Sequence, residues 1–197
     1  MEAHRLRRAI ELIIREVSFV SYGWLLDPKL CIECRSCEAA CKQWNGVDTF
    51  VGVRLRQVRV REMASYPEPK LQVLSLACNH CEVPWCLMVC PVKAIKRRAD
   101  GIVYIDPDVC VGCQFCAKFC PYRIPTFNPV KHKMEKCTMC FDRIDQGLQP
   151  ACANNCPTGA LKWGKWEDIA DKGEGKVDGF TDPQYTRPHI RFITQGW

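Results

Sequence analysis

The cysteines constrain this chain more than any other feature. Sixteen of its 197 residues are cysteine, about 8% of the chain, a level at which cysteine chemistry begins to define the class of a protein. They fall into four groups of four with none left over: Cys31, Cys34, Cys37 and Cys41; Cys78, Cys81, Cys86 and Cys90; Cys110, Cys113, Cys116 and Cys120; and Cys137, Cys140, Cys152 and Cys156. This regularity indicates four built sites rather than scattered core thiols.

The third group has the spacing C-x2-C-x2-C-x3-C-P, which is the bacterial ferredoxin run for a [4Fe–4S] cluster. Three cysteines at steps of three let a tight loop wrap one face of a cubane, and the fourth lies about a helical turn further on and points elsewhere. The second group has four residues between Cys81 and Cys86, and the fourth group has eleven between Cys140 and Cys152. In the first group Lys42 replaces the final proline. These changes lengthen or alter a loop without removing a ligand.

Two other uses of the cysteines fit less well. Disulfide frameworks do not favour repeated CxxCxxC triplets, and no secretion signal is visible. Structural zinc sites usually take paired CxxC units, often with histidine. Triplets followed by a fourth Cys-Pro favour iron–sulfur clusters.

The charge of the chain also fits clusters. The chain is formally +6, with 28 basic and 22 acidic residues. Four [4Fe–4S]2+ cores, each with four thiolates, add about −8 and leave the loaded protein near −2. The basic excess therefore offsets the clusters and does not indicate nucleic-acid binding, and no basic-aromatic module such as an RNP motif is present.

The segments outside the cysteine groups predict short elements. Apolar residues recur at helical steps over residues 1–20, which predicts a helix that packs on the domain, docks on a partner subunit or lies on a membrane surface. Its charges argue against an export signal despite Arg7-Arg8. No apolar run approaches the roughly 18 residues of a membrane span.

Further along the chain, strands are expected beside the cysteine groups. Residues 50–61 alternate apolar and basic side chains, which predicts a strand with a slip or bulge near Gln57. Residues 94–105 predict a hairpin that turns at Asp100-Gly101. Residues 158–163 follow Cys156-Pro157 as residues 92–97 follow Cys90-Pro91, which indicates an internal repeat.

The run from Cys31 to Trp163 resembles a known family. The segments CIECRSCEAACK, CNHCEVPWCLMVCP, CVGCQFCAKFCPY and CTMCFDRIDQGLQPACANNCP resemble the four-cluster electron-transfer subunits of the dimethyl sulfoxide reductase class of molybdenum or tungsten pterin oxidoreductases. The gaps of four and eleven residues are the specific features, because a simple two-cluster ferredoxin has neither.

The resemblance implies an α+β fold of two intertwined bacterial-ferredoxin-like halves with a pseudo-two-fold repeat. We expect residues 1–26 to form an N-terminal amphipathic helix, residues 27–163 the double ferredoxin-like domain, and residues 164–197 a C-terminal extension. The extension is expected to contain a short helix at Trp166 to Asp171 and a terminal strand within His189 to Thr194.

The resemblance also implies four [4Fe–4S] clusters with crossed ligands, since the third group is complete. The implied ligand sets are Cys31, Cys34, Cys37 and Cys156 for the first cluster; Cys41, Cys137, Cys140 and Cys152 for the second; Cys78, Cys81, Cys86 and Cys120 for the third; and Cys90, Cys110, Cys113 and Cys116 for the fourth.

As a function, the resemblance implies a non-catalytic subunit that relays single electrons to or from a large Mo- or W-pterin catalytic subunit. A membrane-anchor, flavin or other redox subunit, or a soluble carrier, would be the second partner. A free-standing polyferredoxin shuttle and a structural zinc module are the alternatives. We expect a cytoplasmic location, with membrane association or export bound to a partner as the other options.

Some residues near the cysteines have two interpretations. Glu33 stands where the first loop usually has glycine, and we expect its side chain to face solvent. Trp44, Trp85 and Phe119 are expected either to exclude water beside the sites or simply to pack in the core. His80 is expected to be a supporting or surface residue rather than a ligand. Five basic side chains either support the reduced clusters or are solvated surface charges: Arg35, Lys42, Lys93, Lys118 and Lys136.

Overall fold

Short helices and short strands alternate along this chain. The computed structural model describes residues 21–49, 51–63, 67–68 and 70–194, so the helix predicted for residues 1–20 lies outside the described residues. The helices are α2 (Ser36–Trp44), α3 (Trp85–Met88), α4 (Phe115–Lys118), α5 (Phe141–Ile144), α6 (Ala151–Asn154), α7 (Trp166–Ile169) and the 3-10 turn η1 (Pro183–Tyr185). The strands are β1 (Tyr22–Leu26), β2 (Arg56–Glu62), β3 (Leu71–Ala77), β4 (Ile95–Arg97), β5 (Val103–Ile105), β6 (Thr126–Asn128), β7 (Lys133–Glu135), β8 (Leu161–Lys165) and β9 (Ile190–Phe192).

One sheet joins the two ends of the described chain, in the order β8-β1-β9. Strand β1 pairs antiparallel with β8 and parallel with β9. The grouping of residues 22–26 with an N-terminal helix is therefore wrong, because these residues form a strand with a buried face. The C-terminal extension supplies α7 and β9, as predicted, and closes the sheet against β1.

The β2–β3 hairpin differs from the prediction. Its register runs without interruption from Arg56 opposite Ala77 to Glu62 opposite Leu71, so the bulge expected near Gln57 is wrong. The apolar pattern changes parity at Leu55 and Arg56 because the strand begins there, and the residues before it approach the core as irregular chain.

Two further hairpins lie among the cysteine groups. The hairpin predicted at residues 94–105 is confirmed as β4–β5. Gly101 has φ +78°, which suits glycine, and the amide of Ile102 donates to the Asp100 side chain at 3.2 Å. Strands β6 and β7 form the other hairpin.

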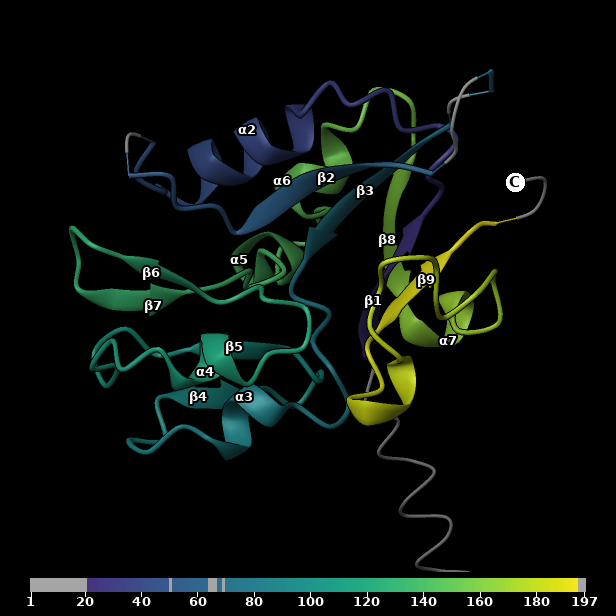
Figure 1. Cartoon of the computed structure of the whole chain (residues 1–197). Helices are drawn as coiled ribbons and strands as arrows, with labels where there is room; N and C mark the ends of the chain where they lie inside the picture. Colours follow the sequence, from purple (N-terminus) through teal and green to yellow (C-terminus); the bar gives the residue numbers. More distant parts are fainter. Residues whose placement is uncertain (1–20, 50, 64–66, 69, 195–197) are drawn as a thin grey trace, which may run out of the picture.

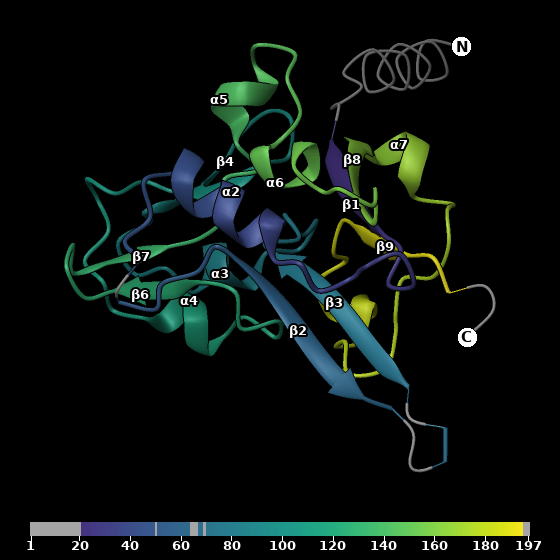
Figure 2. The same cartoon turned by 90° about the horizontal axis from the view of Figure 1, so that it is seen from above.

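The apolar core has two parts. The larger part lies around β1, β3, β8 and β9 and includes Trp24, Leu26 and Phe192. The smaller part gathers residues of β4, β5 and β7 with two cysteines of the third group. Figure 1 shows β1, β8 and β9 on one side of the molecule and β4, β5, α3 and α4 on the other, and the view in Figure 2 agrees. Cysteines belong to both parts, since the larger one contains Cys37, Cys41, Cys137 and Cys152 and the smaller one Cys110 and Cys116.

Candidate metal centres

The four cysteine loops share one backbone bend. In each group the second residue after the first cysteine has a left-handed conformation: Glu33, His80, Gly112 and Met139, with φ of 57°, 44°, 70° and 58°. This conformation turns the chain sharply and is uncommon for residues other than glycine. All four loops therefore turn in the same way after their first cysteine, although only one of them has glycine there.

A second bend follows the last cysteine of three groups. Lys93, Arg123 and Gly159 each stand three residues after a Cys-Pro cysteine and have positive φ. Strands β4 and β8 then begin five residues after Cys90 and Cys156. In the first group, where Lys42 replaces proline, helix α2 instead continues to Trp44. The proline thus marks where the helical turn ends and the chain leaves the site.

Backbone amides point at several of the sulfur atoms. Ala94 donates to Cys90 Sγ at 3.2 Å and Leu161 donates to Cys156 Sγ at 3.4 Å. The amide of Met139 lies 3.2 Å from Cys137 Sγ, and that of Met134 lies 3.5 Å from Cys110 Sγ. Such donors stabilise negative charge on sulfur, as expected where thiolates bind iron.

Cysteines from the first and last groups lie side by side. Burial raises the pKa of the Cys31 thiol, and charge on Cys156 and Cys34 raises it further. Burial also raises the pKa of Cys41 to about 12, with added contributions from Cys152 and Cys140. The side-chain amide of Asn45 lies 3.8 Å from the sulfur atoms of both Cys41 and Cys140.

The second and third groups meet in the same way. Burial raises the pKa of Cys81 to about 12, and the neighbouring thiols that raise it further are those of Cys78, Cys120 and Cys86. Burial likewise raises the pKa of Cys116 to about 11, with contributions from Cys110, Cys113 and Cys90. At neutral pH these buried thiols hold their protons unless a metal ion takes the place of the protons. Metal binding and loss of the thiol protons are therefore coupled, as is expected of a metal site.

All sixteen cysteines lie within the described residues and carry free thiols. Within the same residues, no group of three or more His, Cys, Asp or Glu side chains is arranged to hold a single metal ion. The thiols that lie together come from two groups of the chain and have amide donors around them, and this donor set fits iron–sulfur clusters.

Comparison with known proteins shows the family. Residues 69–166 match the 4Fe-4S dicluster domain family. The chain is 36% identical over 181 residues to the B subunit of the anaerobic dimethyl sulfoxide reductase of Escherichia coli K12, covering 86% of both proteins. It is similar to protein NrfC of the same organism, at 39% identity over 77% of this chain and 69% of that one. It is also 33% identical to the formate dehydrogenase iron-sulfur subunit of Haemophilus influenzae, over 80% of this chain and 56% of that one.

The chain belongs to the family of iron–sulfur electron-transfer subunits that includes the B subunit of dimethyl sulfoxide reductase. The protein accordingly holds four [4Fe–4S] clusters, a number that its sixteen cysteines fit. In the part of the chain that the structure describes, no helix combines the length and apolar character needed to cross a lipid bilayer.

The basic residues near the cysteines differ in their surroundings. Arg35, Lys93 and Lys118 are exposed. Lys42 lies half-buried, and its ammonium donates to the carbonyls of Asp48 and Val53 at 2.9 and 2.6 Å, so it holds backbone in place.

Lys136, by contrast, is buried against cysteines of two groups. Its ammonium donates to Cys78 Sγ and to the Cys137 carbonyl, both at 3.2 Å, and to the Val103 carbonyl. Among the five basic residues singled out from the sequence, Lys136 is thus the one placed to compensate cluster charge.

Several aromatic and polar residues also have clear positions. Trp44 and Phe119 are exposed, so the expectation that they pack in the core is wrong. Trp44 instead donates to Asp142 at 2.7 Å under the guanidinium of Arg143. Trp85 is half-buried and makes a tilted contact with the ring of Tyr185, so for it the expectation of packing holds.

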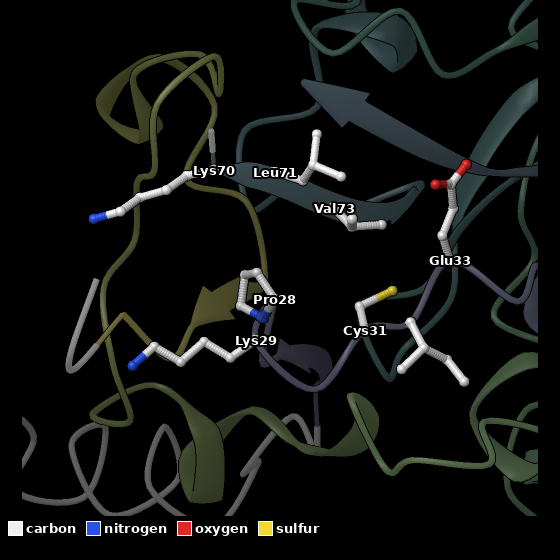
Figure 3. Close-up of a pocket in the computed structure, with 8 residues that line it drawn as sticks. Pro28, Lys29, Cys31, Glu33, Lys70, Leu71 and Val73 are labelled. Atoms are coloured by element: carbon white, nitrogen blue, oxygen red, sulfur yellow. The ribbon is translucent and has the colours of Figure 1, made fainter. Parts of the chain in front are cut away.

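His80 and Glu33 both occupy left-handed positions within a cysteine loop. His80 is buried, and its Nδ1 accepts from the Val103 amide at 3.0 Å, which makes it a supporting residue rather than a surface one. The Glu33 carboxylate pairs with Arg35 at 2.9 Å near the surface, as expected. Figure 3 shows this carboxylate turned away from Cys31.

Sequence reasoning missed Arg56, which is buried beside the first and last groups. Arg56 lies in the run of alternating apolar and basic residues at 50–61, so from the sequence it resembled the other basic residues of that run, which are typical of a solvated face. The one available signal was the change in apolar parity at Leu55 and Arg56.

Gly112 offers a test of the loop geometry. A Cβ atom at this position would lie 2.5 Å from the His132 carbonyl oxygen, in addition to the cost of about 1–2 kcal/mol for an alanine at positive φ. We expect Gly112→Ala to release iron from the site that includes Cys110 and Cys113 several times faster than the wild-type protein in denaturant, as followed by bleaching of the visible absorbance. Gly147→Ala is the matched control, since Gly147 has φ +73° with open space around it. Equal rates for the two variants would contradict the close approach.

Proposed function

We propose that this protein relays single electrons between a molybdenum- or tungsten-pterin catalytic subunit and a second redox partner, and that it forms and breaks no substrate bond itself. The relatives support this proposal, since they are named as a component of dimethyl sulfoxide reductase and as an iron–sulfur subunit of formate dehydrogenase. The observation that carries it is the gathering of thiols from four groups into one small protein. Each cluster, when bound, supplies a one-electron carrier.

We further propose the crossed ligand sets that the family resemblance implies. The position of Asn45, near both Cys41 and Cys140, supports Cys41 as the ligand that completes the site of the fourth group. Charge on Cys156 raises the pKa of Cys31, and this proximity supports Cys156 as the ligand that completes the site of the first group. Cys120 lies near Cys81, which supports it as the ligand that completes the site of the second group. Cys90 lies near Cys116, which supports it as the ligand that completes the site of the third group.

The side chains between the sites support a linear order from the first site to the fourth. Helix α2 carries both Cys37 and Cys41, which belong to the first and second sets. Lys136 contacts Cys78 of the third set and the carbonyl of Cys137 of the second. Charge on Cys116, of the fourth set, adds to the effect of burial in raising the pKa of Cys86, of the third set, so the two thiols lie near each other. These residues hold neighbouring sites close together.

The two ends of this order reach the surface. Cys34 and Cys113 are the exposed cysteines of the sixteen, and the apolar side chains beside them, Ile32 and Val111, are 65% and 60% exposed. Figure 3 shows Cys31 at the edge of a surface pocket of about 520 Å³ near the first end. We therefore place electron entry and exit at the first and fourth sites.

The finer fold is also a proposal: two ferredoxin-like halves that exchange their fourth cysteines and are related by a pseudo-two-fold repeat. The four shared left-handed bends support this arrangement. So does the common distance of five residues from Cys90 to β4 and from Cys156 to β8.

Isolation of the native complex tests the function. We expect the protein to elute from size-exclusion chromatography together with a much larger subunit that contains a pterin cofactor, and to carry about sixteen iron atoms with matching sulfide. Elution of the fully loaded chain near its own 22.6 kDa would contradict the subunit role and support a free polyferredoxin shuttle. About four zinc ions without sulfide would contradict both.

A further inference from the structure

Arg56 begins strand β2 and carries a charge into the centre of the molecule. The residue is 2% exposed. One terminal nitrogen of its guanidinium donates to the Ser75 carbonyl at 3.0 Å and to the Ser75 hydroxyl at 3.2 Å. The guanidinium also stacks over Trp24, with Cζ 4.3 Å from the ring centroid. The side chain is therefore fixed in one orientation.

This buried cation has no carboxylate partner. Among the described residues, no Asp or Glu forms an ion pair with Arg56, and its Nε and second terminal nitrogen have no hydrogen-bond acceptor. A buried charge without compensation costs several kcal/mol, so a fixed cation of this kind requires negative charge nearby.

Cysteine sulfur atoms near Arg56 would carry that negative charge once they bind iron. The Ser75 hydroxyl that accepts from Arg56 lies 3.2 Å from Cys37 Sγ. Burial by itself lowers the pKa of Arg56, but negative charge on Cys152, Cys137, Cys37 and Cys41 outweighs burial and raises it. In the crossed ligand sets, Cys37 belongs to the first site, and the other three cysteines belong to the second.

We propose that Arg56 is the shared counter-cation of the first and second clusters and that its charge raises the reduction potentials of both. Reduction adds one negative charge to a cluster, and a fixed cation stabilises that reduced form. Because one guanidinium lies near two sites, it stabilises the reduced form of either cluster. Both reduction potentials are therefore higher than they would be without it. The proposal rests on the crossed ligand sets proposed above.

A purely structural role for Arg56 predicts the opposite result. If Arg56 only filled space beside Trp24 and Ser75, its removal would admit water to the sites. Water stabilises the more negative reduced form and raises the potential. The sign of the shift therefore separates the two roles.

The test is a redox titration of the loaded protein followed by EPR. In Arg56→Gln we expect two of the four clusters to become at least tenfold harder to reduce, a fall in midpoint potential of about 59 mV for a one-electron couple, while the other two do not move. Arg56→Lys, which keeps the charge, should shift the same two clusters by less than half as much. Arg61→Gln is the matched control, because Arg61 is an exposed arginine of the same strand, and all four potentials should stay at their wild-type values.

A fully loaded Arg56→Gln protein in which fewer than two potentials fall, or in which they rise, would overturn the proposal. If Arg56→Gln does not retain sixteen iron atoms, Arg56→Lys decides the matter. Retention of all clusters by Arg56→Lys supports a requirement for charge, and loss from both variants assigns Arg56 a packing role. Failure of the relay function itself would appear separately, in the metal content and partner of the wild-type protein.

Discussion

Cys41→Ser is expected to remove the cluster held by the fourth cysteine group and to leave the cluster held by the first group intact. Cys41 lies in helix α2, directly after the first triplet in sequence, so a ligand set read from adjacency would assign it to Cys31, Cys34 and Cys37. In the structure the Cys41 thiol is buried near those of Cys140 and Cys152, and the side-chain amide of Asn45 lies 3.8 Å from the sulfur atoms of both Cys41 and Cys140. Serine binds iron less well than a thiolate, so the affected cubane should be lost or damaged.

The measurement is iron content together with EPR of the reduced protein. We expect iron to fall from about sixteen toward about twelve atoms per chain, with loss of one cluster signal. Cys156→Ser is the reciprocal variant and should remove a different signal, that of the first group. If Cys41→Ser and Cys34→Ser abolish the same signal, the crossed ligand sets are wrong.

Removal of the clusters is expected to unfold one part of the protein and spare another. The smaller core, around β4, β5 and β7, contains six buried residues, and two of them are Cys110 and Cys116. Without iron, this part keeps too little apolar contact to offset the entropy of ordering the chain. The sheet β8-β1-β9 has the fully buried side chains of Leu26, Ile190 and Phe192 and should outlast it.

Hydrogen exchange after anaerobic chelation of iron measures this difference. Amides of β4 and β5 should lose protection by at least a hundredfold, and amides of β1 and β9 should change less. A matched sample, treated in the same way and then reconstituted with iron and sulfide, should recover protection in β4 and β5. Equal loss in both regions would mean that the clusters support the whole fold uniformly.

Elements defined by local residues were predictable. The β4–β5 hairpin follows from the Asp100-Gly101 turn between two short apolar runs. Helix α7 and strand β9 of the C-terminal extension were predicted as well. The cysteine loops are local too, because the spacing of each triplet fixes how a short chain segment bends.

Elements that depend on distant partners were not predictable. Residues 22–26 look like the end of a helix until Ile190–Phe192 lies parallel to them. The apolar and basic residues that alternate before β2 resembled a bulged strand. The paired strand begins only at Arg56, however, because the last residue of β3, Ala77, lies opposite it. His80 and Lys136 were possible surface residues, and only packing against β5 shows that both are buried.

The sequence by itself determined the chemistry of this protein, because cluster binding depends on thiols at short fixed spacings that no other residue can replace. The tertiary structure decided which thiols of distant groups meet and that Arg56 lies between them. Ligand spacing is a local property of the chain. The burial of a charge is decided by residues far away in sequence, and contacts with those residues produce no repeating pattern in the local sequence.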